Sequence, residues 1–358
     1  MYSVQVVGRD SGCVGLMTVA DYDTDSVAGL LVKAGFEHAI LSINTCSKGG
    51  NNRAYRVETS HDVFAVKKYF RHESDVRDRL ATEFKFLVYA DQVAPGFAPK
   101  PYVKDDENGF ALYEFVDGEA FEPGKVDAAE IKRAAEFFRA LNQRKAKAKP
   151  HDLPFASEAC FSIQNHIDLI GRRLNGLTEI VVGDEEDQQL KTLVQKLQTC
   201  WRLMVAELLE LARAAKLSVD ENLDESQRCV SPSDFGFHNA LRGIDGSIRF
   251  LDFEYAGKDD PAKMAGDFFA QLAIPIPGAL FGDFVENCFA PLPWADSLIR
   301  RAHLLRPLYR FKWCCIALNV FLPASIARRK FANPGLDVTA VKRAQLAKAD
   351  KIYQSLEK

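Results

Sequence analysis

The spacing of apolar residues changes once along this 358-residue chain, and that change restricts the possible folds more than any other feature. Residues 38–116 hold short runs such as "HAILSI", "AYRVET" and "DVFAVKKYF", which are rich in β-branched and aromatic residues, as β-strands are. After Gly118 apolar residues recur every three or four positions, which predicts helices. One β-like interruption, at 228–255, breaks the helical part. We therefore expect an α+β fold, with a small antiparallel sheet and a helix followed by a mostly helical part.

The same spacing predicts individual elements. In the sheet-rich part we expect strands at 38–43, 54–59 and 62–70, a helix at 78–90 and a hairpin formed by 99–106 and 109–118, with one short helix before them inside 23–35. In the helical part we expect helices at 127–143, 157–174 and 185–215, and more helices from 263 to the C-terminus. We divide the chain into an N-terminal extension (1–37), an N-lobe (38–116) and a helical C-lobe (117–358).

Composition and charge exclude several classes of protein. Hydrophobic residues make up 47% of the chain and charged residues 27%, and the formal net charge is -3, so no nucleic acid or membrane partner is indicated. No apolar run reaches about 18 residues, so we expect no transmembrane helix. The eight cysteines form no C-x-x-C pair and we recognise no signal peptide, so we expect reduced thiols and a cytoplasmic location.

A glycine-rich turn lies between the first two expected strands. In "SKGGNNRAYRV", Gly49, Gly50 and Asn51 form a turn in which backbone N–H groups can approach an anion closely. That geometry suits a nucleotide polyphosphate. Because Asn and Gly are common in all turns, a plain hairpin turn is the alternative interpretation.

The strand that contains "FAVKK" places a lysine beside a small residue. Ala65 and Lys67 share one face of the strand, which leaves room for a planar ring next to an ammonium that holds phosphate oxygens. A buried lysine needs a carboxylate partner, and Glu83 on the following helix is the candidate. The alternatives are a solvated lysine at the sheet edge and a surface glutamate on the helix.

The segment "LYEFVDG" leads from the sheet into the helical part. Backbone groups of a connecting strand are free to pair with an adenine base, and the Glu114 carbonyl and the Val116 amide are the candidate pair.

Three oxygen-bearing side chains lie in two loops that a short hairpin connects. Asp234 and Asn239 are five positions apart in "VSPSDFGFHN", and Asp252 ends the run "IRFLDF", with a turn at Asp245-Gly246 between them. Phosphoryl transfer needs a base near the attacking hydroxyl and hard oxygen ligands for Mg²⁺, which these residues supply. Ordinary turn chemistry is the alternative for each residue taken alone.

Two other kinds of site fit this segment less well. His238 and Asp234 lack the further histidine or cysteine ligands that a zinc site needs, apart from Cys229. A Ser-His-Asp hydrolase that uses Ser231 or Ser233 would need a G-x-S-x-G elbow, which is absent.

The order of motifs over residues 38–322 resembles that of the aminoglycoside phosphotransferase and choline kinase group. The motifs are, in order along the chain, G-G-x-N, A-x-K, a helix glutamate, a connecting strand, D-x-x-x-x-N and "DFE". The resemblance implies a bilobal protein-kinase-like fold that uses ATP and Mg²⁺. By position it implies that Asp234 is the catalytic base and that Asn239 and Asp252 are the Mg²⁺ ligands. It also implies that Lys67 contacts the α- and β-phosphates with Glu83 as its partner.

Further positions match the group's motifs or depart from them. Gly49, Gly50 and Asn51 correspond to the phosphate loop, and Asp267 in "AGDFF" corresponds to an aspartate that braces the catalytic loop, although a helix N-cap explains it equally well. The group's histidine two places before the catalytic aspartate is Pro232 here, the glycine before the aspartate is Ser233, and the histidine after it is Gly236. His238 stands where the group often has glycine. These departures indicate a distinct branch.

The expected function is ATP- and Mg²⁺-dependent phosphorylation of a hydroxyl on a small molecule such as an amino alcohol, a sugar or an aminoglycoside-like compound. A catalytically silent nucleotide-binding scaffold is the alternative, which Pro232 favours. In "LRPLYRFKWCCIALNVF", Arg306 and Arg310 are candidates to bind an anionic or sugar acceptor, and Tyr309 and Trp313 to bind a quaternary ammonium. A packed aromatic stripe with a solvated basic face is the favoured interpretation of this helix.

Overall fold

The structure is a computed structural model that describes residues 24–47, 52–71, 77–143, 152–332 and 335–356. The chain packs into two compact units. The first consists of Met1–Pro154 and Asp234–Gly257, and the second of Phe155–Ser233 and Lys258–Lys358. The hairpin that carries the expected metal ligands therefore belongs to the same unit as the sheet.

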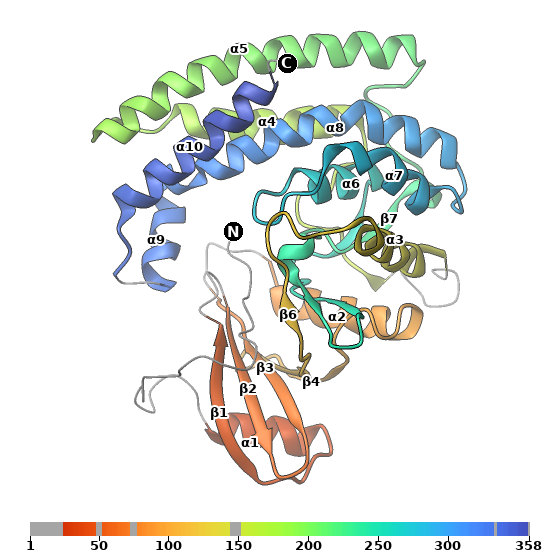
Figure 1. Ribbon diagram of the computed structural model, residues 1–358, viewed down its shortest axis with the longest axis vertical. Helices are drawn as coiled ribbons and strands as arrows, with labels where there is room; N and C mark the ends of the chain where they lie inside the picture. The colour runs from red at the N-terminus through yellow and green to blue at the C-terminus, as the bar shows by residue number, and fades with distance from the viewer. Residues whose placement is uncertain (1–23, 48–51, 72–76, 144–151, 333–334, 357–358) are drawn as a thin grey trace. The chain divides into compact units, whose positions relative to one another are not determined.

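The first unit is built on a five-stranded antiparallel sheet with the order β1-β2-β3-β5-β4 (Figure 1). Its strands are β1 (Ile40–Ser47), β2 (Arg53–Thr59), β3 (Val63–Lys68), β4 (Pro101–Asp105) and β5 (Phe110–Glu114). The helix α1 (Thr24–Lys33) packs its apolar residues on one face of this sheet. The strands and the hairpin predicted from alternation are confirmed.

Strand β3 shows why alternation positions the candidate lysine. Phe64 and Val66 point into the core under α1, while Ala65 and Lys67 lie on the opposite face, as the sequence predicts. Lys67 is opposite Ala54 on β2 and Ala111 on β5, so small residues flank it on both neighbouring strands.

The rest of the first unit consists of two helices and a second, three-stranded sheet. Helix α2 (Arg79–Val93) begins at its N-cap Asp78, whose side chain accepts from the Ala81 N–H, and α3 (Ala128–Gln143) follows the short strand β6 (Glu119–Ala120). Strands β6, β8 (Ala240–Arg242) and β9 (Ile248–Phe250) form the sheet. The turn predicted at Asp245-Gly246 joins β8 and β9, and Gly246 has a φ of 76°.

Aromatic stacking holds the segment after β9 against the helices of this unit. Phe137 of α3 stacks on Phe250 at 5.2 Å between ring centroids, and Phe86 of α2 stacks on Phe253 at 4.6 Å. Asp252 lies between these two anchored rings, so packing fixes its backbone. Gly118 is required nearby, because a Cβ at this position would lie 2.8 Å from the Arg242 carbonyl oxygen.

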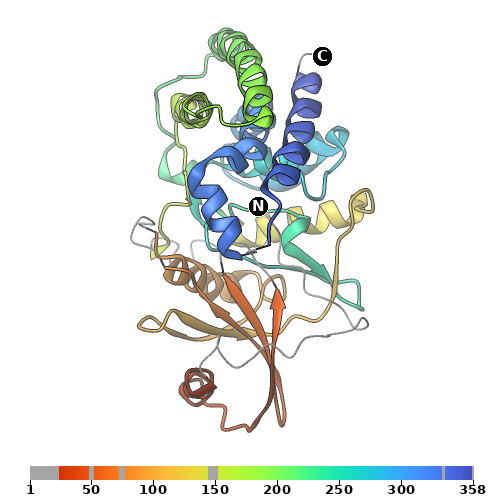
Figure 2. The same cartoon turned by 90° about the vertical axis from the view of Figure 1, so that its left-hand side faces the viewer.

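The second unit is almost wholly helical. Its helices are α4 (Ile163–Thr178), α5 (Glu185–Ala214), α6 (Pro261–Ala270), α7 (Phe281–Phe289), α8 (Ala295–Ala317), α9 (Pro323–Ala332) and α10 (Val338–Leu356), and the short strands β7 (Cys229–Ser231) and β10 (Gly257–Asp259) pair. Helices α4, α5, α8 and α10 lie side by side (Figures 1 and 2). Helix α4 begins six residues later than predicted, because Ser162 and Asn165 form a capping box there.

Among the described residues, no helix is both long and apolar enough to span a membrane. The expected boundary between an N-lobe and a C-lobe at 116/117 remains a prediction.

Candidate active site

Lys67 is the centre of a buried ionic cluster in the first unit. Its Nζ lies 2.6 Å from Glu83 Oε2 and 2.6 Å from Asp252 Oδ1. Lys67 comes from β3, Glu83 from α2 and Asp252 from the segment after β9. Although burial disfavours the ammonium, the attraction of Asp252, Glu83 and Glu254 holds the pKa of Lys67 well above its usual value.

Further hydrogen bonds hold Glu83 in place. The Tyr69 hydroxyl donates to Glu83 Oε2 at 2.6 Å, and the Phe253 N–H donates to Glu83 Oε1 at 3.2 Å. Tyr69 also shares a 2.8 Å hydrogen bond with the Tyr113 hydroxyl. Burial, and then the charge of Glu83, raises the pKa of Tyr69 well above its usual value, so this hydroxyl stays a donor. The partner of Lys67 is therefore fixed before any ligand binds.

The cluster holds more negative than positive charge. Three carboxylates, Glu83, Asp252 and Glu254, face two cations, Lys67 and Arg79, and Arg79 Nη1 donates to Glu254 Oε1 at 2.8 Å. Burial, only partly offset by Lys67, and repulsion from Glu254 and Glu83 together raise the pKa of Asp252 from 3.8 to about 7. A buried site with one carboxylate in excess fits a bound cation.

Asn239 links Asp234 to the segment that carries Asp252. The Asn239 Nδ2 donates to the Asp234 carbonyl oxygen at 3.0 Å, and the Leu251 N–H donates to the Asn239 carbonyl at 2.8 Å. The β8–β9 hairpin thus places Asn239 next to the residue that precedes Asp252. In the described part of the chain the Asn239 side-chain oxygen has no hydrogen-bond partner, so it is free to bind a cation.

His238 contacts the candidate base directly. Its Nε2 lies 3.2 Å from Asp234 Oδ1. Burial disfavours ionisation of Asp234, but the charge of His238 and hydrogen bonds from His238 and Asn239 outweigh it, so the pKa of Asp234 lies below its usual value. Asp234 is therefore ionised at neutral pH and can accept a proton or a hydrogen bond.

Two residues at this site have left-handed backbone conformations. Ser233, which precedes the candidate base, has a φ of 66°, and Asp252 has a φ of 64°. Such conformations are costly for residues other than glycine and often occur at functional sites.

The predicted adenine contacts lie where β5 ends. The Glu114 side chain accepts hydrogen bonds from Arg249 Nη2 at 2.5 Å and from the Lys100 N–H at 3.0 Å. Among the described residues, none accepts a hydrogen bond from the Val116 N–H. The predicted phosphate-loop residues Gly49, Gly50 and Asn51 lie outside the described residues.

The aromatic residues of α8 are packed inside the second unit, as the favoured interpretation of this helix predicts. Tyr309 is fully buried, and its hydroxyl lies 2.5 Å from His166 Nδ1. Trp313 Nε1 donates to Asp267 Oδ1 at 2.8 Å. Both residues are thus unavailable to a quaternary ammonium.

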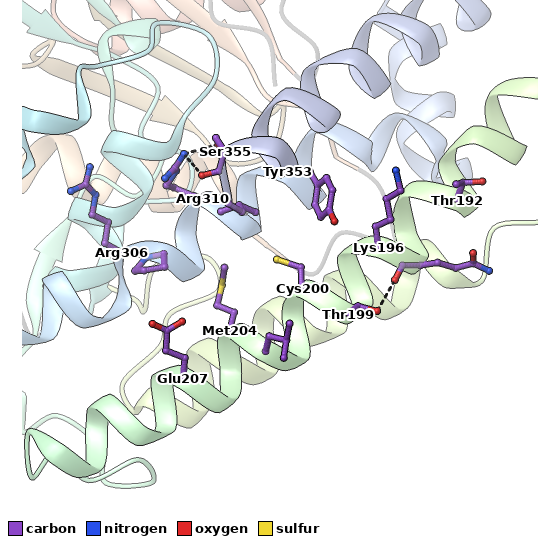
Figure 3. Close-up of a pocket in the computed structure, with 14 residues that line it drawn as sticks. Thr192, Lys196, Thr199, Cys200, Met204, Glu207, Arg306, Arg310, Tyr353 and Ser355 are labelled. Atoms are coloured by element: carbon purple, nitrogen blue, oxygen red, sulfur yellow. Dashed lines mark hydrogen bonds between the residues drawn. The ribbon is translucent and has the colours of Figure 1, made fainter. Parts of the chain in front are cut away.

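The basic residues of α8 face a different environment. Arg306 and Arg310 line an open groove of about 1120 Å³ between α5, α8 and α10, together with Met204 and Glu207 (Figure 3). Arg310 Nη2 donates to the Ser355 hydroxyl at 2.6 Å, which ties α8 to the end of α10. These contacts explain the basic face of α8 without an acceptor.

Asp267 lies inside α6 and joins that helix to α8. Lys312 Nζ lies 2.9 Å from both of its carboxylate oxygens. The N-cap alternative for Asp267 is wrong, because Asp260 caps α6 and Pro261 is its first residue. Bracing of the catalytic loop by Asp267 remains a prediction.

A family model described as the phosphotransferase enzyme family matches residues 42–284, more than half of the chain. The chain belongs to this family. No curated protein matches its sequence. This match confirms, at the level of the family, the resemblance that the sequence motifs predicted.

Solved structures with the same fold cover nearly the whole chain. An ethanolamine kinase from Plasmodium vivax is 15% identical, with a TM-score of 0.54 over 94% of this chain and 87% of that one. A choline kinase from Cryptosporidium parvum is 14% identical, with a TM-score of 0.56 over 93% and 96%. A spectinomycin phosphotransferase, in complex with ADP and its antibiotic, is 11% identical, with a TM-score of 0.53 over 91% and 99%. The predicted α+β, protein-kinase-like fold is confirmed.

Several residues of the cluster were not predicted. These residues are Tyr69, which follows β3, Arg79, which begins α2, and Glu254, which lies in the segment after β9. Only Glu254 left a local signal, since it ends the "DFE" motif. Tyr69 and Arg79 depend on contacts between distant parts of the chain, which local spacing does not reveal.

Proposed function

We propose that this protein transfers a phosphoryl group from ATP, with Mg²⁺, to a hydroxyl of a small molecule. The observation that carries the proposal is the convergence of Lys67, Asp252, Asn239 and Asp234 within one compact unit. Phosphoryl transfer needs a positive charge that binds phosphate, oxygen ligands for a metal ion and an ionised carboxylate that acts as the base. Lys67 supplies the first, Asp252 and Asn239 the second and Asp234 the third.

Asp234 takes the role of the base that orients the acceptor. Its pKa lies below its usual value, so the carboxylate accepts the hydrogen bond of a hydroxyl at neutral pH. Contacts with His238 and Asn239 fix its orientation, which lets the rate gain come from positioning. As the hydroxyl oxygen forms its bond to the γ-phosphorus of ATP, the bond from that phosphorus to the β–γ bridging oxygen breaks, ADP leaves, and the hydroxyl proton moves to the Asp234 carboxylate.

Asp252 and Asn239 would hold the metal, because their oxygens and the excess negative charge of the cluster fit a hard divalent cation. When bound, Mg²⁺ neutralises negative charge on phosphate oxygens. In the described part of the chain no three His, Cys, Asp or Glu side chains gather to hold a metal ion. Two protein ligands suit Mg²⁺, which takes its remaining ligands from water and phosphate.

Lys67 would bind phosphate oxygens of the nucleotide, and Glu83 would keep its ammonium in place. The Val116 N–H and the Glu114 carbonyl are proposed to bind the adenine, and Gly49, Gly50 and Asn51 the phosphates. In the described part of the chain no group accepts a hydrogen bond from the Val116 N–H, which supports the first assignment.

The acceptor class follows from similarity of fold alone. The similar structures are named as an ethanolamine kinase, a choline kinase and a spectinomycin phosphotransferase, so amino alcohols and amino sugars are the first acceptors to test. The test incubates the protein with Mg²⁺, ATP and each acceptor, and measures both ADP and phosphorylated product. Product with one acceptor supports the proposal. Nucleotide binding without ADP or product from any acceptor would favour a silent scaffold.

A further inference from the structure

Asn52 connects the start of β2 to the metal-binding segment. Its side-chain Nδ2 donates to Glu254 Oε2 at 2.5 Å, across 202 positions of sequence. Its Oδ1 accepts from the Phe70 N–H at 3.1 Å, just after β3. A single side chain therefore joins the beginning of β2, the end of β3 and the segment that carries Asp252.

Glu254 is engaged on both of its carboxylate oxygens. Oε2 accepts from Asn52, and Oε1 accepts from Arg79 Nη1 at 2.8 Å. The side chains of Arg79 and Glu254 are 3% and 2% exposed, so little water is available to replace either partner.

The clamp formed by Asn52, Glu254 and Arg79 shares its supports with the Lys67 cluster. Arg79 lies one turn before Glu83 on α2, and Glu254 lies two residues after Asp252. Arg79 also donates to the Tyr255 hydroxyl at 3.2 Å. A shift of the start of β2 relative to Asp252 would therefore break a buried hydrogen bond to a charged group.

We propose that Asn52 is a positioning residue that holds the start of the β2 strand in register with Asp252, so that the nucleotide and its metal ion are bound together. This inference rests on the proposed function. Asn52 acts through Glu254, and it does not itself touch the reacting atoms.

The inference predicts a loss that depends on the metal. Binding of a fluorescent ADP analogue is measured with and without Mg²⁺ for the wild type and for Asn52→Ala. Asn52→Ala should bind the Mg²⁺ complex of the nucleotide about tenfold more weakly than the wild type, because it loses one hydrogen bond to a charged group. Its affinity for the metal-free nucleotide should change by less than about twofold. Asn52→Asp places a carboxylate against Glu254, and it should weaken the Mg²⁺ complex further.

Asn108→Ala is the matched control. Asn108 is also an asparagine of the first unit whose amide donates to a carboxylate, that of Asp105, but in the exposed turn between β4 and β5. This variant should bind the nucleotide as the wild type does, with and without Mg²⁺. Urea unfolding of all variants shows whether each is folded. The double variant Asn52→Ala with Glu254→Gln should lose less affinity for the Mg²⁺ complex than the two single variants lose together.

The outcomes separate this inference from the proposed function. If Asn52→Ala binds the Mg²⁺ complex as tightly as the wild type, or loses affinity equally with and without Mg²⁺, the positioning role is wrong and the proposed function stands. If the wild type binds no nucleotide under either condition, the proposed function fails and this inference fails with it.

Discussion

Lys67 Nζ and Asp252 Oδ1 lie 2.6 Å apart although 185 positions separate the two residues in the sequence. The contact joins the middle of the five-stranded sheet to the end of the β8–β9 hairpin within one compact unit. The cation that we propose binds phosphate and the carboxylate that we propose binds the metal are thereby in contact before any ligand binds.

Replacing Asp234 by asparagine should remove most of the transfer rate. The amide keeps the size of the side chain but cannot take the hydroxyl proton, so kcat should fall by about 100-fold to 10,000-fold. Nucleotide affinity should change little, because Asp234 contacts His238 and Asn239 and not Lys67. Steady-state kinetics and nucleotide titration together check this. Full turnover by Asp234→Asn would contradict the assignment of the base.

Lys67 and its neighbour Lys68 provide a matched pair. Lys67→Met removes the cation between Glu83 and Asp252, and kcat/KM for ATP should fall by about 100-fold or more. The Lys68 ammonium lies 5.0 Å from the centre of the Phe110 ring and has no role in the cluster, so Lys68→Met should retain activity. An equal fall in kcat/KM in the two variants would show that activity depends on the positive charge of β3 in general and not on Lys67 in particular.

Acidity should control metal binding through Asp252. The raised pKa of about 7 means that this carboxylate is largely protonated below neutral pH, so Mg²⁺ affinity should fall by up to about tenfold per pH unit below 7. The folded-state pKa exceeds the usual 3.8, so the metal-free protein should lose stability as the pH rises from 3.8 through about 7. Added Mg²⁺ should restore this stability above about pH 7, where Asp252 is ionised and can bind the metal ion.

Thermal unfolding with and without Mg²⁺, at about pH 6 and about pH 8.5, measures this effect. Asp252→Asn has no charge to titrate, and it should show neither the pH-dependent loss nor the Mg²⁺ gain. A Mg²⁺ gain in Tm of the same size at both pH values in the wild type would argue against Asp252 as the ligand.

Replacing either of two helix glycines of the second unit by alanine should change the free energy of unfolding, but in opposite directions. A Cβ on Gly266 of α6 would lie 2.3 Å from Tyr309 Cδ2, in the packed contact between α6 and α8, so Gly266→Ala should lower the free energy of unfolding by about 1–3 kcal/mol. Gly176 of α4 has open space at the same point, and Gly176→Ala should raise it by about 0.5–1 kcal/mol. Urea unfolding of both variants measures the two signs. A stabilising Gly266→Ala would contradict this packing.

The parts of the fold and site that sequence predicts are those governed by local periodicity. Alternation along β3 places Ala65 and Lys67 on one face, and the turn at Asp245-Gly246 pairs the two motif loops. Packing decides the rest. The sequence favours burial of Tyr309 and Trp313, but only the positions of α4 and α6 determine that they form hydrogen bonds with His166 and Asp267.

Contacts over long sequence separations were equally hidden. The ion pair between Arg79 and Glu254 and the hydrogen bond from Asn52 to Glu254 join segments 175 and 202 positions apart. Glu254 ends the "DFE" motif and Asn52 ends the G-G-x-N motif, but nothing in the sequence indicates that Asn52 and Arg79 are the hydrogen-bond partners of Glu254. The start of α4 at Ile163 depends on the Ser162–Asn165 capping box, which lies inside the apolar spacing that predicted an earlier start.

The most direct test of the central claim is a crystal structure of the protein with Mg²⁺ and a non-hydrolysable ATP analogue. The account predicts a metal ion bound by Asp252 and the Asn239 side-chain oxygen, with the Lys67 ammonium against the α- and β-phosphates and Asp234 facing the γ-phosphate. A nucleotide bound elsewhere, or a metal ion whose ligands include neither Asp252 nor Asn239, would contradict it.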